Sequence, residues 1–142
     1  MKRFTQLICL MLVCSFVLGI PAFAAEVQPY ASNYFGSHSC YLSEVSSSTF
    51  KVCFEVVAVS TMDQLGTSVI IVQKSSDRVN WSDVKTYTKE SYSQMTASNT
   101  VAHGSYVTFS EAEAGYYYRA YVKFYAKKGV NSAVYVDYTS YI

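Results

Sequence analysis

The chain has 142 residues, a net charge of +1 and an aromatic content of 16%. A disordered chain lacks this many aromatic residues, so the composition predicts a folded domain. The nearly balanced charge gives no basic excess of the kind that binds nucleic acid or an anionic membrane surface. We therefore expect neither of these as a partner.

The first 24 residues have the features of a cleavable secretory signal. A positively charged start precedes an apolar run over residues 7–20, and Ala22-x-Ala24 fits a signal-peptidase site. The run is shorter than the ~20 residues that span a bilayer. An uncleaved anchor is the alternative interpretation. We expect a secreted protein that begins near Ala25, with nine basic and ten acidic residues remaining.

The mature part is expected to hold a loose lead-in over residues 25–36 and one domain over residues 37–142. Short runs of alternating polar and apolar residues, separated by turn residues, are typical of an all-β chain. Their number and spacing predict a seven-stranded antiparallel β-sandwich. The expected strands cover residues 38–44, 49–59, 68–74, 81–87, 105–110, 116–125 and 133–138, with loops at residues 60–66 and 89–99.

Residues 116–125 show the clearest alternation, because every second residue of a strand points to the same face. One set of side chains is uncharged and is expected to face the core: Tyr116, Tyr118, Ala120, Val122 and Phe124. The other set holds both charges and is expected to face outward: Tyr117, Arg119, Tyr121, Lys123 and Tyr125.

Two cysteines, Cys40 and Cys53, remain after the signal is removed. With a turn centred between Ser46 and Ser47 they lie directly opposite each other, within the distance that a disulfide needs. We therefore expect a disulfide in an oxidising compartment. The same register turns Leu42 outward. A bulge in the first strand would return Leu42 to the core but separate the two cysteines, leaving free thiols.

The segment Ala114-Gly115-Tyr116-Tyr117-Tyr118-Arg119-Ala120 resembles the corner and sixth strand of fibronectin type III domains. The resemblance implies that the sandwich is of the fibronectin type III or immunoglobulin-like (Ig-like) kind. The resemblance implies a tyrosine whose hydroxyl binds the corner backbone. Tyr116 matches this position first, and Tyr118 is the second choice.

The mature chain is also similar to small secreted proteins of clostridial-type Gram-positive bacteria that have no known function. The segment from Val72 to Asp77 that leads to Trp81, together with the tyrosine-rich strand, carries this similarity. It implies a fold and a compartment but no activity. Ser75-x-Asp77 with Trp81 resembles a single Asp-box hairpin of sialidase propellers, where these residues are structural. We expect Asp77 and Trp81 to stabilise a hairpin.

The sequence contains few residues suited to catalysis. It has two histidines, His38 and His103, and no spacing typical of a metal site or a serine nucleophile. Glu111 and Glu113 form an acidic corner, which is weak evidence for a Ca²⁺ site. We expect no cofactor and no metal.

The row Tyr117, Arg119, Tyr121, Lys123 and Tyr125 is the candidate binding surface. Flat aromatic faces beside cations suit a glycan or a protein, and the alternative is an ordinary outer strand face. The leading hypothesis is a secreted, non-enzymatic module that binds a protein or glycan. The others are a small hydrolase built around His103 or the acidic corner, and a self-associating envelope or matrix protein.

Overall fold

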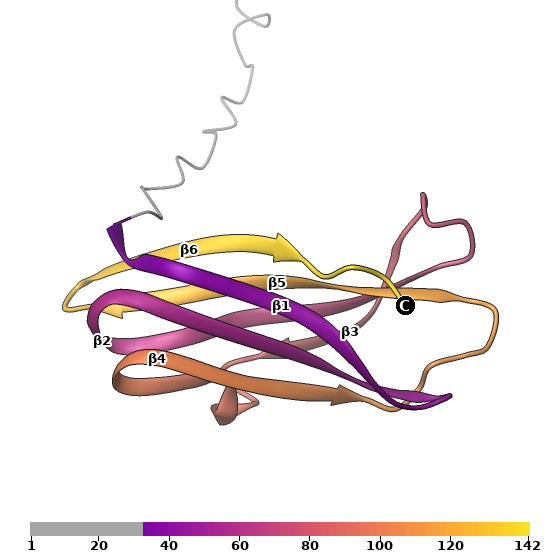
Figure 1. Cartoon of the computed structure of the whole chain (residues 1–142), viewed down its shortest axis with the longest axis horizontal. Helices are drawn as coiled ribbons and strands as arrows, with labels where there is room; N and C mark the ends of the chain where they lie inside the picture. Colours follow the sequence, from indigo (N-terminus) through magenta and orange to yellow (C-terminus); the bar gives the residue numbers. More distant parts are fainter. Residues whose placement is uncertain (1–32) are drawn as a thin grey trace, which may run out of the picture.

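The computed structural model describes residues 33–142, and this part of the chain is all-β (Figure 1). Six antiparallel strands form one curled sheet, and a short 3-10 turn, η2, precedes the fourth strand. The expected signal over residues 1–24 and most of the expected lead-in lie outside the described residues. The elements are β1 (Phe35–Ser46), β2 (Thr49–Ser75), β3 (Ser82–Thr88), η2 (Ser93–Met95), β4 (Thr96–Phe109), β5 (Tyr117–Lys128) and β6 (Asn131–Tyr138).

The long strand β2 organises the sheet. Its first half pairs with β1 on one side and with β4 on the other. Its second half pairs with β5, with β3 and with the start of β4, and β6 extends the sheet from β5. Figure 1 shows β2 curling back on itself at one end of the molecule. Each half therefore builds a different part of the sheet.

The predicted loop over residues 60–66 is wrong, and with it the predicted count of seven strands. Met62 and Leu65 are almost completely buried, and the backbone around them pairs with β4. Polar neighbours such as Asp63 hide this alternation in the sequence. Two expected strands are consequently one continuous strand, and the described residues hold six.

The inner faces of the two halves of β2 contribute to a single core. The ring centroid of Phe50, in the first half, lies 5.5 Å from that of Tyr118 on β5. Phe109 of β4 lies 5.8 Å from the same Tyr118 ring. The predicted inner face of β5 is confirmed for four residues that are at most 3% exposed: Tyr118, Ala120, Val122 and Phe124.

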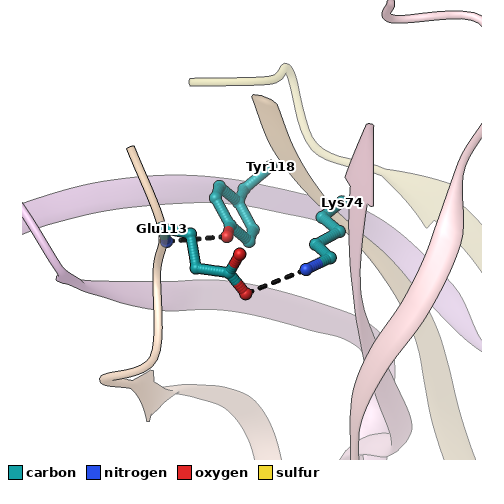
Figure 2. A network of polar contacts seen from close by, with 3 residues as sticks. All are labelled: Lys74, Glu113 and Tyr118. Carbon is teal, nitrogen blue, oxygen red and sulfur yellow. Dashed lines mark hydrogen bonds and ion pairs between the residues drawn. The ribbon is translucent and has the colours of Figure 1, made fainter. Parts of the chain in front are cut away.

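Tyr116 was expected inside, with its hydroxyl bound to the corner backbone, and the structure corrects both points. It precedes β5, is 41% exposed, and has the Lys74 ammonium 4.6 Å from its ring centroid. The corner tyrosine is Tyr118, whose hydroxyl accepts a hydrogen bond from the Glu113 backbone N–H at 2.8 Å (Figure 2). The Glu113 carboxylate also binds Lys74 Nζ at 2.9 Å. Since the strand begins at Tyr117, Tyr118 is its first inward position.

The predicted disulfide is wrong, because Cys40 and Cys53 are free and are not cross-strand partners. Cys40 pairs with Phe54, and Tyr41 pairs with Cys53. A register shift near the end of β1 displaces the pairing by one residue. This is the bulged alternative: Leu42 packs against the core, and the two thiols lie on opposite faces of the sheet.

The predicted polar loop over residues 89–99 is shorter than expected, because β4 begins at Thr96. Met95 is fully buried and lies against β2 at Gly66. A Cβ atom on Gly66 would lie 2.1 Å from the Met95 carbonyl oxygen. The glycine therefore permits the close approach of β2 to the segment before β4.

Candidate functional site

The predicted binding row lies on the outer face of β5, and its five side chains are half-buried. They are Tyr117, Arg119, Tyr121, Lys123 and Tyr125. The row is not an isolated stripe, because residues of neighbouring strands lie beside it. Arg119 pairs across β2 with Gln73, and Tyr121 pairs across β6 with Tyr138.

Arg119 contacts two aromatic rings and one side-chain amide. Its guanidinium carbon lies 4.3 Å from the ring of Trp81 and 4.7 Å from the ring of Tyr138. Its Nε donates to Gln73 Oε1 at 2.8 Å, and Gln73 Nε2 donates to Asp83 Oδ1 at 2.7 Å. Such stacking uses the negative face of each ring and fixes the plane of the cation.

Arg78 repeats this arrangement at the end of the sheet. Its guanidinium carbon lies 4.0 Å from the Tyr117 ring and 5.1 Å from the Tyr141 ring, and Nη2 donates to Tyr117 Oη at 2.6 Å. The centroids of Trp81 and Tyr141 are 6.5 Å apart, so the two stacks adjoin. We call these six residues the aromatic–arginine ladder: Tyr138, Arg119, Trp81, Tyr141, Arg78 and Tyr117.

The turn between β2 and β3 positions two members of the ladder. Asp77 Oδ1 accepts the backbone N–H groups of Val79 and Asn80, both at 2.8 Å. These bonds, led by that from Asn80, hold the pKa of the Asp77 carboxyl well below its usual range. Arg78 adopts a φ of 62°, and its carbonyl accepts the indole N–H of Trp81 at 3.2 Å. The turn thus fixes Arg78 and Trp81 together, and the structural role expected for Asp77 fits this geometry.

The rest of the row continues along β5, away from the ladder. The ring of Tyr121 meets that of Tyr138 edge to face at 5.4 Å. Lys89 Nζ lies 3.9 Å from the centroid of Tyr125 and donates to Gln64 Oε1 at 3.2 Å. The face therefore carries cations against aromatic rings along most of the length of β5.

The sequence located part of this face and missed the remainder. Tyr117 and Arg119 were expected outward on a strand, whereas Trp81 was expected to stabilise a hairpin. Tyr138 could have been found by extending the alternation of β6, which places it on the same face as Tyr121. Tyr141 lies beyond β6. No local pattern shows that a residue there meets Arg78, because that contact joins distant segments.

The opposite outer face of the sheet provides a contrast. Tyr41 of β1 and Tyr106 of β4 flank Cys53 of β2, and they are 49% and 47% exposed. Lys51 Nζ lies 4.1 Å from the Tyr106 centroid. The ladder tyrosines Tyr138 and Tyr141 are equally exposed, at 47% and 49%. The tyrosine rings on the two faces are therefore equally exposed. On the ladder face these rings contact arginines, whereas on the opposite face the cation over Tyr106 is a lysine.

The residues considered for catalysis have structural partners. His103 Nε2 lies 2.9 Å from the Gln94 carbonyl oxygen, and its ring centroid lies 5.7 Å from that of Phe54. Glu113 of the acidic corner forms an ion pair with Lys74, and Glu111 is exposed. Within residues 33–142, no three histidine, cysteine or acidic side chains converge as metal ligands would.

A second cluster lies between β1 and β6. The ring centroid of His38 is 4.1 Å from that of Tyr135 and 5.0 Å from that of Phe124. His38 Nε2 is 4.0 Å from Asp137 Oδ2. Burial, with a smaller contribution from Asp137, raises the pKa of the Cys40 thiol to about 12. Cys40 therefore stays protonated, and the cluster packs the two strands together.

Comparisons with known proteins identify no relative: no family model, curated protein or solved structure matches the chain. Across residues 33–142, no helix has the length and hydropathy needed to span a membrane.

Proposed function

We propose that the chain is a secreted, non-enzymatic β-sandwich module that binds a protein or glycan outside the cell. The aromatic–arginine ladder is its binding surface. Secretion is supported by the charged start, the short apolar run and the small-residue site within residues 1–24.

The sandwich of the fibronectin type III kind is supported by the curl of β2. Its first half carries β1 and much of β4, its second half carries β5 and β3, and both halves line one core. Tyr118 at the corner agrees with the resemblance to that family. The similarity to small secreted proteins of clostridial-type bacteria fits the same compartment.

The observation that carries the binding proposal is the ladder itself. Two of its rings, Tyr138 and Tyr141, remain about half exposed although they contact arginines. Tyrosine, tryptophan and arginine are the residues that most often anchor an interface. Here they are fixed before a partner arrives, which lowers the entropy lost on binding.

The test is capture of partners from cells and cell-wall material by the purified mature protein. The double variant Tyr138→Ser with Tyr141→Ser should lose capture, because each truncated anchor costs about 2 kcal/mol, roughly thirtyfold in affinity. The matched control is Tyr41→Ser with Tyr106→Ser, which removes equally exposed rings from the opposite face. Unchanged capture by the ladder variant, or equal loss in both variants, contradicts the proposal.

Secretion is tested separately by mass spectrometry of the culture supernatant. We expect a mature chain that begins near Ala25. Protein that retains Met1 and stays in the membrane would show that the segment is an uncleaved anchor.

A further inference from the structure

The cations on the ladder face have no carboxylate partners. Within residues 33–142 the two ion pairs are Lys74 with Glu113 and His38 with Asp137, and neither involves this face. The cations of the face are Arg78, Arg119, Lys89, Lys123 and Lys127, and the contacts found for the first three are with rings, amides and a hydroxyl. The carboxylates of Asp83 and Asp77 lie near the face and keep their charges, although they accept hydrogen bonds from Gln73 and from the turn backbone. Five cations against these two carboxylates leave the face locally positive although the chain is nearly neutral.

The two guanidinium groups are prepared for an anion. Each contacts two aromatic rings, which restrict its movement, and the hydrogen bonds found use Nε of Arg119 and Nη2 of Arg78. A guanidinium has five N–H donors, so several remain on each group. A carboxylate can accept two of them side by side, which is the strongest and most directional pairing open to arginine.

The exposed rings add a second requirement on the ligand. Tyr138 and Tyr141 offer apolar ring faces beside the guanidinium groups, together with phenolic hydroxyls. A sugar ring has apolar C–H patches and hydroxyl groups, and an acidic sugar adds a carboxylate to both. Arginine donors beside exposed ring faces match the carboxylate and the apolar C–H patches of one acidic sugar unit. This complementarity favours a carboxylated glycan, and an acidic protein is the other class of partner that the experiment distinguishes.

We propose that the ladder face binds an acidic polysaccharide, with the carboxylates on Arg78 and Arg119 and the sugar faces on Tyr138 and Tyr141. This inference rests on the proposed function, because it names the class of ligand for the same surface.

Trp81 gives a direct readout, because it is the protein's only tryptophan and stacks on Arg119. The probes are polygalacturonate and hyaluronan, each compared with its methyl-esterified form, which keeps the sugar backbone and loses the charge. We expect Trp81 fluorescence to change saturably with the acidic polymers. Binding of the esters should be at least about tenfold weaker, the loss expected when charged hydrogen bonds are removed. High salt should weaken binding of the acidic forms.

The decisive variants are Arg78→Gln and Arg119→Gln, each expected to weaken binding of the acidic polymers about tenfold. Lys51→Gln is the matched control, since Lys51 also lies over a tyrosine ring but on the opposite face. Its affinity should equal that of the unaltered protein. Circular dichroism spectra that match the unaltered protein establish that each variant is folded.

The outcomes separate this inference from the proposed function. Equal affinity for acidic and esterified polymers overturns the inference while binding by the ladder stands. No response to either acidic polymer also overturns it, and capture of an acidic protein through the same tyrosines would then identify the other class of partner. If the double variant Tyr138→Ser with Tyr141→Ser captures every partner as well as the unaltered protein does, the proposed function fails as well.

Discussion

The two halves of β2 build two outer faces that differ in a way the composition does not show. The first half places Cys53 between Tyr41 of β1 and Tyr106 of β4. The second half places Gln73 beside Arg119, in a stack of rings and guanidinium groups. Both faces are rich in tyrosine, so tyrosine content alone does not mark a binding surface. The distinguishing feature is the pair of arginines that each contact two rings and that form no ion pair within residues 33–142.

The largest expected effect comes from disturbing the second half of β2 where it passes the segment before β4. Gly66→Ala should destabilise the protein by about 3 kcal/mol or more, because its Cβ would collide with the Met95 carbonyl and the backbone at φ 152° disfavours a side chain. Chemical denaturation measures the change.

Gly129→Ala is the control for that substitution. Gly129 also has a positive φ, at 61°, but no atom lies within 4 Å of its added Cβ. We expect a cost of about 1 kcal/mol from the backbone alone. Equal losses of stability for the two variants would show that the close approach of Gly66 to Met95 does not contribute to the cost of Gly66→Ala.

The second-largest effect concerns the corner between β4 and β5, where Tyr118 binds Glu113. Tyr118→Phe should cost about 1–2 kcal/mol, since it removes the hydroxyl that accepts the Glu113 N–H. Tyr116→Phe should change little, because that side chain is largely outside the core. Urea denaturation of both variants compares them. A larger loss of stability for Tyr116→Phe would show that Tyr116 is the corner tyrosine, as expected from the sequence.

A smaller effect, of opposite sign, is expected at Thr67 in the second half of β2. Its hydroxyl is completely buried and has no hydrogen-bond partner among residues 33–142. Thr67→Val should therefore stabilise the protein by about 1 kcal/mol, because a similar shape replaces an unsatisfied polar atom. A measured destabilisation would indicate that the hydroxyl has a partner in solution, such as a bound water.

The smallest effect concerns the turn that holds Arg78 and Trp81. The carboxyl of Asp77 has a lowered pKa in the folded state, so its stabilising contribution is complete above the ordinary carboxyl pKa of ~4. That contribution is lost as pH falls below this value, through the folded pKa. The stability of Asp77→Asn should consequently depend less on pH in this acidic range than that of the unaltered protein. Denaturation at several pH values measures the two slopes, and equal slopes would contradict the turn's role.

Local alternation made the inner face of β5 and the β5–β6 hairpin predictable. Tyr118, Ala120 and Val122 are core residues for a reason that is visible within ten residues of sequence. The continuity of β2 was not predictable in this way, because Met62 and Leu65 become buried only once β4 pairs beside them. The disulfide prediction failed on a register shift of one residue between Glu44 and Ser46, which reverses the face of the β1 side chains that precede it.

The candidate site was predictable only where it lies on one strand. Arg119 and Tyr117 follow from the alternation of β5, but their partners Trp81 and Tyr141 come from a turn and from the segment after β6. Stacking between such distant segments depends on the tertiary fold. The sequence therefore indicated a row, whereas the structure contains a ladder that crosses several segments.

The central claim, that the ladder face and not the opposite face is the binding surface, can be tested most directly by NMR. Amide and indole resonances of isotope-labelled mature protein would be followed while polygalacturonate is added. We predict shifts at the Trp81 indole and at the amides around Arg78, Arg119 and Tyr138, with none around Tyr41, Cys53 and Tyr106. Shifts confined to the opposite face, or spread equally over both faces, would contradict the account.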